Sequence, residues 1–275
     1  MGLREALEKR FGSRLSDFDD VLENNPTLLA MAGRGSCRSF QDQRVDPDLL
    51  ELLAGVALSS PTKSDLQQRD IIIIQDREAR AALASLLPSV TWLDERPALL
   101  VFCGNHRRQR HLHELRGHSF ANDHLDAFFN AACDAAIALS AFVTAAEAIG
   151  LGCCPISAIR NEADAASRLL NLPDQVFPVA ALAVGYPEQS PTISYRLPLS
   201  LTVHRDTFHE GNLDETITTY DARRSKDQPY RSQRNLARFG PSEDYGWSED
   251  KARQYAEPER ETFGAFVRNK GFKLL

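Results

Sequence analysis

The sequence predicts a layered domain of the α/β or α+β class, and three observations support this. Three short runs of β-branched and aliphatic residues are typical of buried strands, at 70–75 (DIIIIQ), 98–103 (ALLVFC) and 178–185 (PVAALAVG). Helical patterns lie between these runs, and strands that alternate with helices indicate a sheet covered by helices. The 275 residues are 43% hydrophobic and 25% charged, which is enough for one large core.

Four segments outside the strands carry helical spacing. Residues 48–58 begin with an acidic residue and continue with an apolar stripe, and residues 77–87 repeat that style after an aspartate. Residues 161–170 predict a helix that ends near Asn171. Apolar spacing returns at 257–272 and predicts a final helix that docks on the core.

Two polar stretches are predicted to lack regular packing. Residues 106–111 (HRRQRH) are interpreted as a solvated loop after the second strand, and residues 220–242 as a mobile or weakly packed excursion. The chain is therefore divided into an extension at 1–25, a core at 26–205 and a C-terminal excursion with a docking helix at 206–275. The sequence suggests no role for the extension.

Composition argues against several classes of protein. A formal net charge of −6 with scattered basic residues is not that of a nucleic-acid binder. An odd number of cysteines without paired spacing indicates free thiols in a reducing compartment and no zinc site. Because the first residues are charged and lack an apolar segment, we expect no secretory signal and a cytoplasmic protein. The cysteines are Cys37, Cys103, Cys133, Cys153 and Cys154.

Residues 128–149 are long and apolar enough to cross a membrane, but they contain Asn130, Asp134 and Glu147 and are rich in alanine. We expect a buried helix there and no membrane association. Its small side chains would let a second helix approach closely, so it is a candidate for the centre of a subunit interface.

Four polar clusters could bind a ligand. Arg34, Ser36 and Arg38 alternate in RGSCRSF, so they share one side of an extended segment and suit a phosphate and an electron-rich ring, or else form a solvated edge. Residues 59–67 (SSPTKSDLQ) form a turn-rich loop with hydroxyl, ammonium and amide groups.

The other two clusters lie later in the chain. Residues 150–160 (GLGCCPISAIR) let backbone approach a planar ligand, although by themselves they are typical of a helix-to-helix connection. Arg196 follows the third strand. No strand is followed by a Rossmann or P-loop glycine motif, so a nucleotide must be held in another way.

These clusters, in this order, resemble the motifs of the nitroreductase superfamily, in its branch of oxygen-insensitive NADPH nitroreductases and NADPH-flavin reductases. RGSCRSF, SSPTKSDLQ and GLGCCPISAIRN are similar to three family motifs, and GYPEQSPTISYRLPLSLTVHRDTF is similar to a fourth. The resemblance spans residues 34–204 and continues weakly to the C-terminus. It implies an α+β fold with three α/β/α layers, a central, mostly antiparallel sheet, and an intertwined homodimer with two FMN sites built from both subunits.

The resemblance also implies roles for individual residues. Charge-assisted bonds to the FMN phosphate would come from Arg34, Ser36 and Arg196, and a cation beside the flavin pyrimidine from Arg38. NADPH preference in this branch is associated with basic residues in the C-terminal excursion, and Arg234 lies nearest to that pattern. The remaining cofactor-binding matches are Pro61, Thr62, Lys63, Ser64 and Gln67 in the loop, and Pro155, Ile156 and Ser157 against one ring face.

Several positions depart from the family pattern. Gly35 replaces a bulkier residue and Ser194 a lysine, which predicts weaker phosphate binding, while Ser157 and Ala158 replace two glycines. Asp65 and Lys63 bring charge into a usually uncharged loop.

The implied activity is reduction of nitroaromatic, quinone or flavin acceptors by NAD(P)H, with NADPH favoured, in ping-pong hydride transfer through FMN. No catalytic side chain and no metal is required. Two alternatives stay open: a weakly catalytic or non-catalytic flavin-binding dimer that acts as a sensor or store, and a reductase with one narrow substrate. The sequence does not identify the physiological acceptor.

Overall fold

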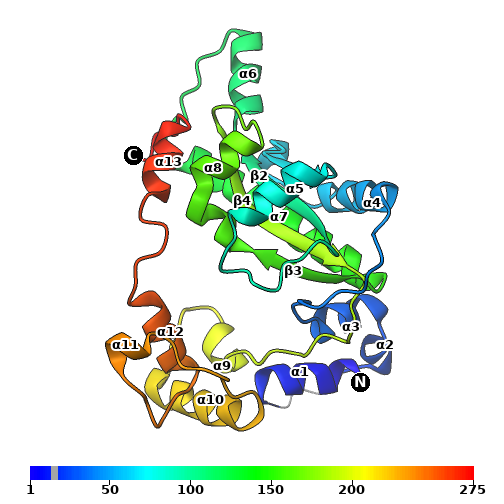
Figure 1. The fold of residues 1–275 in the computed structure, drawn as a ribbon, viewed down its shortest axis with the longest axis vertical. Helices are drawn as coiled ribbons and strands as arrows, with labels where there is room; N and C mark the ends of the chain where they lie inside the picture. The colour runs from blue at the N-terminus through cyan, green and yellow to red at the C-terminus, as the bar shows by residue number, and fades with distance from the viewer. Residues whose placement is uncertain (14–17) are drawn as a thin grey trace. The chain divides into compact units, whose positions relative to one another are not determined.

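The computed structural model describes residues 1–13 and 18–275, which form two compact units (Figure 1). The larger unit consists of residues 34–192 and 260–275, and the smaller of residues 1–33 and 193–259. The boundaries predicted at 25/26 and 205/206 differ from those of the units and stay predictions about domain organisation.

The larger unit is built on a four-stranded sheet in the order β1-β2-β4-β3, with every neighbouring pair antiparallel. The three predicted strands correspond to β1, β2 and β4. The prediction of a plain helix-to-helix connection at residues 150–160 is wrong, because residues 152–156 form the edge strand β3 against β4. The strands are β1 (Arg69–Ile74), β2 (Ala98–Asn105), β3 (Gly152–Ile156) and β4 (Val176–Gly185).

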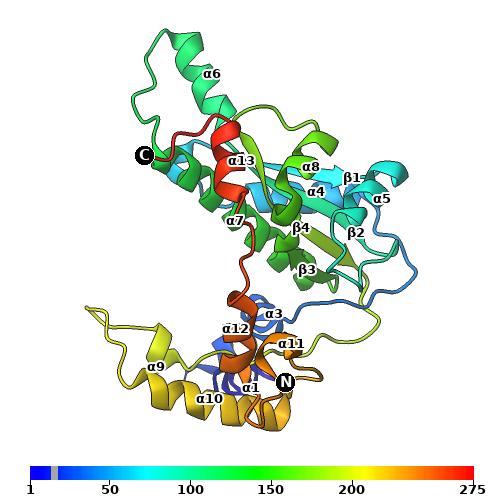
Figure 2. The ribbon, with the colours of Figure 1, turned by 60° about the vertical axis from the view of Figure 1, so that its left-hand side comes forward.

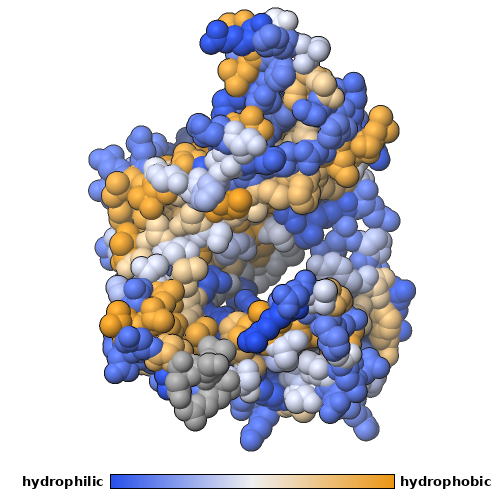
Figure 3. Space-filling view, turned by 180° about the vertical axis from the view of Figure 1, so that it is seen from behind, coloured by the Kyte–Doolittle hydropathy of each residue, from blue (hydrophilic) through white to orange (hydrophobic). Residues whose placement is uncertain are grey.

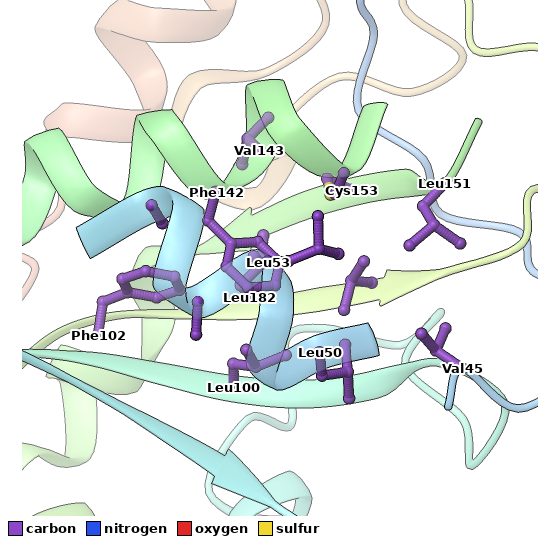
Figure 4. Close-up of a cluster of buried hydrophobic side chains, with 14 of the residues drawn as sticks. Val45, Leu50, Leu53, Leu100, Phe102, Phe142, Val143, Leu151, Cys153 and Leu182 are labelled. Atoms are coloured by element: carbon purple, nitrogen blue, oxygen red, sulfur yellow. The ribbon is translucent and has the colours of Figure 1, made fainter. Parts of the chain in front are cut away.

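Helices cover both faces of this sheet, so the predicted three-layer α+β architecture is confirmed. Alternate strand residues point to opposite faces. Leu100 and Phe102 pack with one helix layer, α4 and α7, whereas Leu99 and Val101 pack with the other. Figure 4 shows the first of these clusters, in which the rings of Phe102 and Phe142 meet edge to face at 5.8 Å. The helices are α4 (Pro47–Leu58) and α7 (Leu125–Ala148) on one face, and α5 (Arg77–Ser85), η2 (Ser157–Glu162) and α8 (Ala163–Leu169) on the other.

Local sequence signals set the ends of the predicted helices. The Asp46 side chain accepts a hydrogen bond from the Asp48 amide at the start of α4, and Asp76 caps α5 in the same way through Ala79. Asn171, at φ 51°, lies just past α8, as the sequence predicted.

Helix α7 is the one helix of the described residues that is long and apolar enough to cross a membrane. Its inner face packs on α4 and on the sheet, through residues such as Ala138 and Phe142. The expectation of a buried core helix is therefore confirmed for that face.

Two further helices complete the larger unit. The basic residues expected to form a solvated loop instead begin α6 (Arg107–Arg116), which ends at Gly117 in the left-handed region. The C-terminal helix α13 (Phe263–Asn269) docks on α7 and α8 as predicted, where Phe266 joins Phe177 in a buried cluster (Figure 2).

The smaller unit is helical. Arg10 is buried in it and donates to the carbonyl oxygens of Ala32 and Ser194 at 2.9 and 3.1 Å. The prediction of a weakly packed excursion from residue 220 is wrong for the part that continues α10, where buried Tyr220 bonds to the Tyr195 carbonyl at 3.1 Å. The helices are α1 (Leu3–Phe11), α2 (Asp20–Glu23), α3 (Pro26–Gly33), α9 (Leu199–Thr202), α10 (Leu213–Asp227), α11 (Leu236–Phe239) and α12 (Trp247–Tyr255).

Candidate functional site

The RGSCRSF segment is extended and carries Arg34 and Ser36, which are predicted to bind the FMN phosphate, and Arg38, which is predicted to lie beside the flavin pyrimidine. Gly35 and Cys37 are buried, while Arg34 and Ser36 are half-buried and Arg38 is exposed. The alternation expected from the sequence is thus present. We call Arg34, Ser36 and Arg38 the arginine row.

Backbone hydrogen bonds hold this segment beside the sheet. The Cys37 amide donates to the Cys153 carbonyl of edge strand β3 at 3.0 Å, and the Glu188 amide donates to Ser39 at 3.1 Å. Arg96 forms an ion pair with Glu188 at 2.6 Å. The arginine row is therefore attached to the β3 edge by main-chain geometry.

Packing explains the glycine at position 35. A Cβ atom built there would lie 2.4 Å from the Thr192 carbonyl oxygen and 2.9 Å from the Pro191 Cβ. Since a larger side chain would collide with backbone, Gly35 is required by close packing of the segment on residues 191–192.

The two arginines of the row differ in their surroundings. Arg34 forms a two-pronged ion pair with Glu147 of α7, at 3.0 and 3.1 Å, which fixes its guanidinium plane. Arg38 makes no hydrogen bond or ion pair to any described residue. The row therefore combines one positioned guanidinium, one hydroxyl and one exposed guanidinium.

The loop at 59–67 is fixed by a buried carboxylate. Asp134 of α7 is 1% exposed, and its two oxygens accept from the backbone amides of Lys63 at 2.9 Å and Gln68 at 3.0 Å. One side chain thus holds both ends of the segment that carries Lys63, Ser64 and Gln67.

Arg69 at the start of β1 holds the first half of the same loop. Its guanidinium donates to the carbonyls of Leu58, Ser60 and Pro61 at 2.7 to 3.0 Å. The Ser60 hydroxyl is buried without a hydrogen-bond partner among the described residues. A buried polar atom of this kind is suited to a bound group.

The loop also has a strained backbone. Ser64, Asp65 and Gln67 have φ values of 48°, 55° and 52°, in the left-handed region that non-glycine residues rarely adopt. Such strain persists only where surrounding contacts enforce it, and it is typical of ligand-binding segments. Within the loop, Thr62 is half-buried and Pro61 is exposed.

The predicted ring-face segment closes strand β3. Pro155 and Ser157 are exposed, whereas Ile156 is 4% exposed and belongs to the core. Ser157 lies 3.5 Å from the Arg260 guanidinium.

The sheet register places the arginine row and the loop at opposite corners of the larger unit. The row joins β3 at Cys153, which pairs with Val184, whereas the loop leads into Arg69, which aligns through Gly104 with Phe177. Seven residues along β4, about 24 Å, and three strand spacings, about 14 Å, separate these points, which is roughly 28 Å along the diagonal. One chain cannot close both groups around one small ligand.

Two predicted residues belong to the smaller unit. The Arg196 amide donates to the Arg10 carbonyl at 2.8 Å, so the N-terminal extension supports it. Arg234 forms an ion pair with the buried Asp250 at 3.0 Å. Their assignments to phosphate and to NADPH stay predictions.

Four of the five cysteines are buried. All five are free. Burial raises the pKa values of the Cys37 and Cys154 thiols, and it raises that of Cys103 to about 12. Because the thiolate is the reactive form, burial makes these three thiols unsuited to nucleophilic catalysis.

Comparison with known proteins decides the family. Residues 31–186 match the nitroreductase family, and residues 194–275 match the C-terminal domain of the nitroreductase family. This chain belongs to the nitroreductase family.

Relatives of this nitroreductase-family chain match along most of their length. "FMN reductase [NAD(P)H]" of Bacillus subtilis is 28% identical, covering 91% of this chain and 99% of the relative. The solved structure of B. megaterium NfrA2 has a TM-score of 0.82 at 30% identity, covering 91% and 99%. The NADPH:FMN oxidoreductase from Vibrio harveyi, complexed with NAD+, has a TM-score of 0.76 at 25% identity, covering 90% and 98%.

The donor groups of this family member fit a flavin mononucleotide. Guanidinium and hydroxyl groups in the arginine row suit a phosphate, and the loop offers polar groups, including the unpartnered Ser60 hydroxyl, to a polar ring edge. The sequence motifs assign no role in the site to Asp134, Arg69 or Arg10. The one sequence signal for Asp134 was its own position as a charged residue in a largely apolar helix.

Proposed function

We propose that this protein is an FMN-dependent oxidoreductase that takes electrons from NAD(P)H, with NADPH favoured, and reduces small acceptors such as nitroaromatics, quinones or free flavins. The observation that carries the proposal is the arginine row, extended and fixed at the β3 edge in a chain of the nitroreductase family. Bound FMN supplies the hydride chemistry, and the protein supplies binding, orientation and electrostatics.

The residues divide the work as follows. Arg34 and Ser36 bind the phosphate, and Arg38 places positive charge beside the electron-rich end of the flavin. The loop at 59–67 contacts the ring through Thr62, Lys63 and Ser64. Because Asp134 and Arg69 hold this loop in advance, little conformational entropy is lost on binding.

We further propose a homodimer in which each cofactor is bound by the arginine row of one subunit and the loop of the other. The separation of these groups within one chain supports a second copy. Exposed apolar side chains on α4 and α7 supply a surface for it, including Leu52 at 63%, Phe129 at 58% and Ile137 at 40% exposed. Figure 3 shows hydrophobic surface across the larger unit.

Free thiols further support a cytoplasmic location.

The proposal is tested on purified protein. It should be yellow or bind added FMN, be bleached by anaerobic NADPH within the turnover time, and have the mass of a dimer by light scattering. Colourless protein that does not take up excess FMN would refute the function. Bound flavin that NADPH bleaches too slowly for turnover would instead support the flavin-binding alternative.

A further inference from the structure

A hollow of about 620 Å³ lies beside the loop proposed to contact the flavin ring. We propose that this hollow binds the anionic group of a planar electron acceptor, and so favours acceptors that carry a phosphate, sulfonate or carboxylate. This inference rests on the proposed function and concerns the choice of acceptor. The lining residues are Asp65, Leu66 and Gln67 from the loop, and Arg107, Arg108, His111 and Leu112 from α6.

The two walls of the hollow are fixed to each other. Arg108 of α6 donates to the carbonyls of Gln67 and Arg69 at 2.7 and 2.9 Å, and it forms an ion pair with Asp70 at 2.6 Å. Because Asp70 neutralises it, Arg108 serves as a strut between helix and loop. The hollow is therefore a formed feature of the larger unit.

A buried contact adds to this strut. His106, immediately before α6, is 2% exposed, and its Nδ1 lies 2.7 Å from Oε1 of Gln68, the residue after the loop. Burial lowers the pKa of His106 to about 4, so the ring is neutral at physiological pH. The start of α6 and the end of the loop are thus held together without adding charge.

Arg107 gives the helix wall an available positive charge. It is exposed and makes no hydrogen bond or ion pair to the part of the chain that the structure describes. His111 lies one turn further along the same helix face. The His111 Nδ1 lies 4.0 Å from Oε2 of Glu114, so Arg107 is the charge of this face that an anion in the hollow would meet without displacing an existing partner.

The loop wall carries the opposite charge. Asp65 is exposed, and its carboxylate accepts from the Gln67 side chain at 3.2 Å. A negatively charged acceptor is repelled from this wall and attracted to α6, while Leu66 and Leu112 offer apolar surface to a planar ring. The charges therefore orient an acceptor as well as attract it.

Free FMN and riboflavin provide a matched pair of probes, since they share one ring system and differ by the phosphate. In the flavin-loaded wild-type protein, KM for FMN as acceptor should be roughly three- to tenfold lower than KM for riboflavin, with the difference shrinking at high salt. Arg107→Ala should remove that difference by raising KM for FMN alone.

Two variants complete the design. Arg116→Ala removes a charge from the far end of the same helix, outside the hollow, and should leave both KM values unchanged. Asp65→Asn removes the negative charge of the loop wall, so it should lower KM for FMN about threefold and leave KM for riboflavin unchanged. Asparagine tolerates the φ of 55° at this position, so the backbone should keep its conformation. Equilibrium dialysis of the flavin-loaded protein against each flavin measures the second flavin bound per chain without turnover.

The outcomes separate this inference from the proposed function. Equal KM values for FMN and riboflavin in the wild type, or equal loss of both in Arg107→Ala, would overturn the acceptor site while leaving the oxidoreductase intact. Protein that binds no cofactor flavin would refute the proposed function instead. Selective loss of FMN binding in Arg107→Ala, in both kinetics and dialysis, would support the site.

Discussion

Replacement of Asp134 by alanine tests whether one buried carboxylate organises the loop at 59–67. The carboxylate accepts two backbone hydrogen bonds, from Lys63 at 2.9 Å and Gln68 at 3.0 Å, in a site that is 1% exposed. A hydrogen bond to a charged group contributes about 1.5–3 kcal/mol, and loss of the acceptor leaves donors unsatisfied. Two such bonds give an expected loss of about 3–6 kcal/mol in the free energy of unfolding.

Urea unfolding followed by circular dichroism measures this loss, and flavin fluorescence measures FMN affinity. We expect Asp134→Ala to lower the urea midpoint and to weaken FMN binding at least tenfold. Asp134→Asn should lie between it and the wild type, because the amide keeps one acceptor oxygen but turns an NH2 group toward the other backbone donor. Asn130→Ala, on the same helix, serves as the control.

A wild-type urea midpoint together with wild-type FMN affinity in Asp134→Ala would refute a role of this carboxylate in organising the loop. A loss of stability without any loss of FMN affinity would show that the carboxylate stabilises α7 and β1 but does not prepare the loop for a ligand.

Three other perturbations have expected results. Arg10→Leu should lower the free energy of unfolding by about 2–4 kcal/mol, because it leaves the Ala32 and Ser194 carbonyls without their donor. Calorimetry would show this as a lower melting temperature, and an unchanged melting temperature would contradict it. Gly35→Ala should cost about 1–3 kcal/mol and weaken FMN binding, since its Cβ would meet the Thr192 oxygen at 2.4 Å; wild-type affinity in titrations would show that the segment can shift. Burial lowers the pKa of His106 to about 4, whereas the unfolded chain takes up this proton near pH 6.5. The fold is therefore most stable above pH 6.5, and the free energy of unfolding falls by about 3 kcal/mol as the pH falls from 6.5 to 4. The free energies of unfolding of the wild type and His106→Gln should diverge by this amount over that pH range. Parallel pH profiles would exclude this contribution of His106.

The sequence predicted those elements whose signals are local. Runs of β-branched and aliphatic residues located β1, β2 and β4, and acidic caps located the starts of α4 and α5. The alternation in RGSCRSF predicted the side on which Arg34, Ser36 and Arg38 lie, since period-2 geometry follows directly from an extended backbone.

Elements that depend on distant partners were missed. The GCCPI run of β3 has little intrinsic strand propensity, and it becomes a strand because β4 supplies its hydrogen bonds. Helices α6 and α10 are almost wholly polar, with Tyr220 the single buried residue of α10, so neither shows an apolar stripe.

The site was predicted in part for the same reason. The residues proposed to bind the ligand occur in contiguous motifs, whereas the residues that support them come from remote segments. Asp134 accepts hydrogen bonds from Lys63 and Gln68, which lie 71 and 66 positions earlier in the sequence. Arg10 donates to Ser194, which lies 184 positions later. No periodicity in the sequence reports such contacts.

The attachment of the arginine row to β3 has a consequence for solubility. β3 is an edge strand, and an open edge offers unpaired backbone groups on which another molecule can add a strand. Cys37 occupies one of these groups and Pro155 has no N–H to donate, so the edge is blunted. Detachment of residues 34–40 would uncover this edge and make the protein prone to edge-to-edge aggregation.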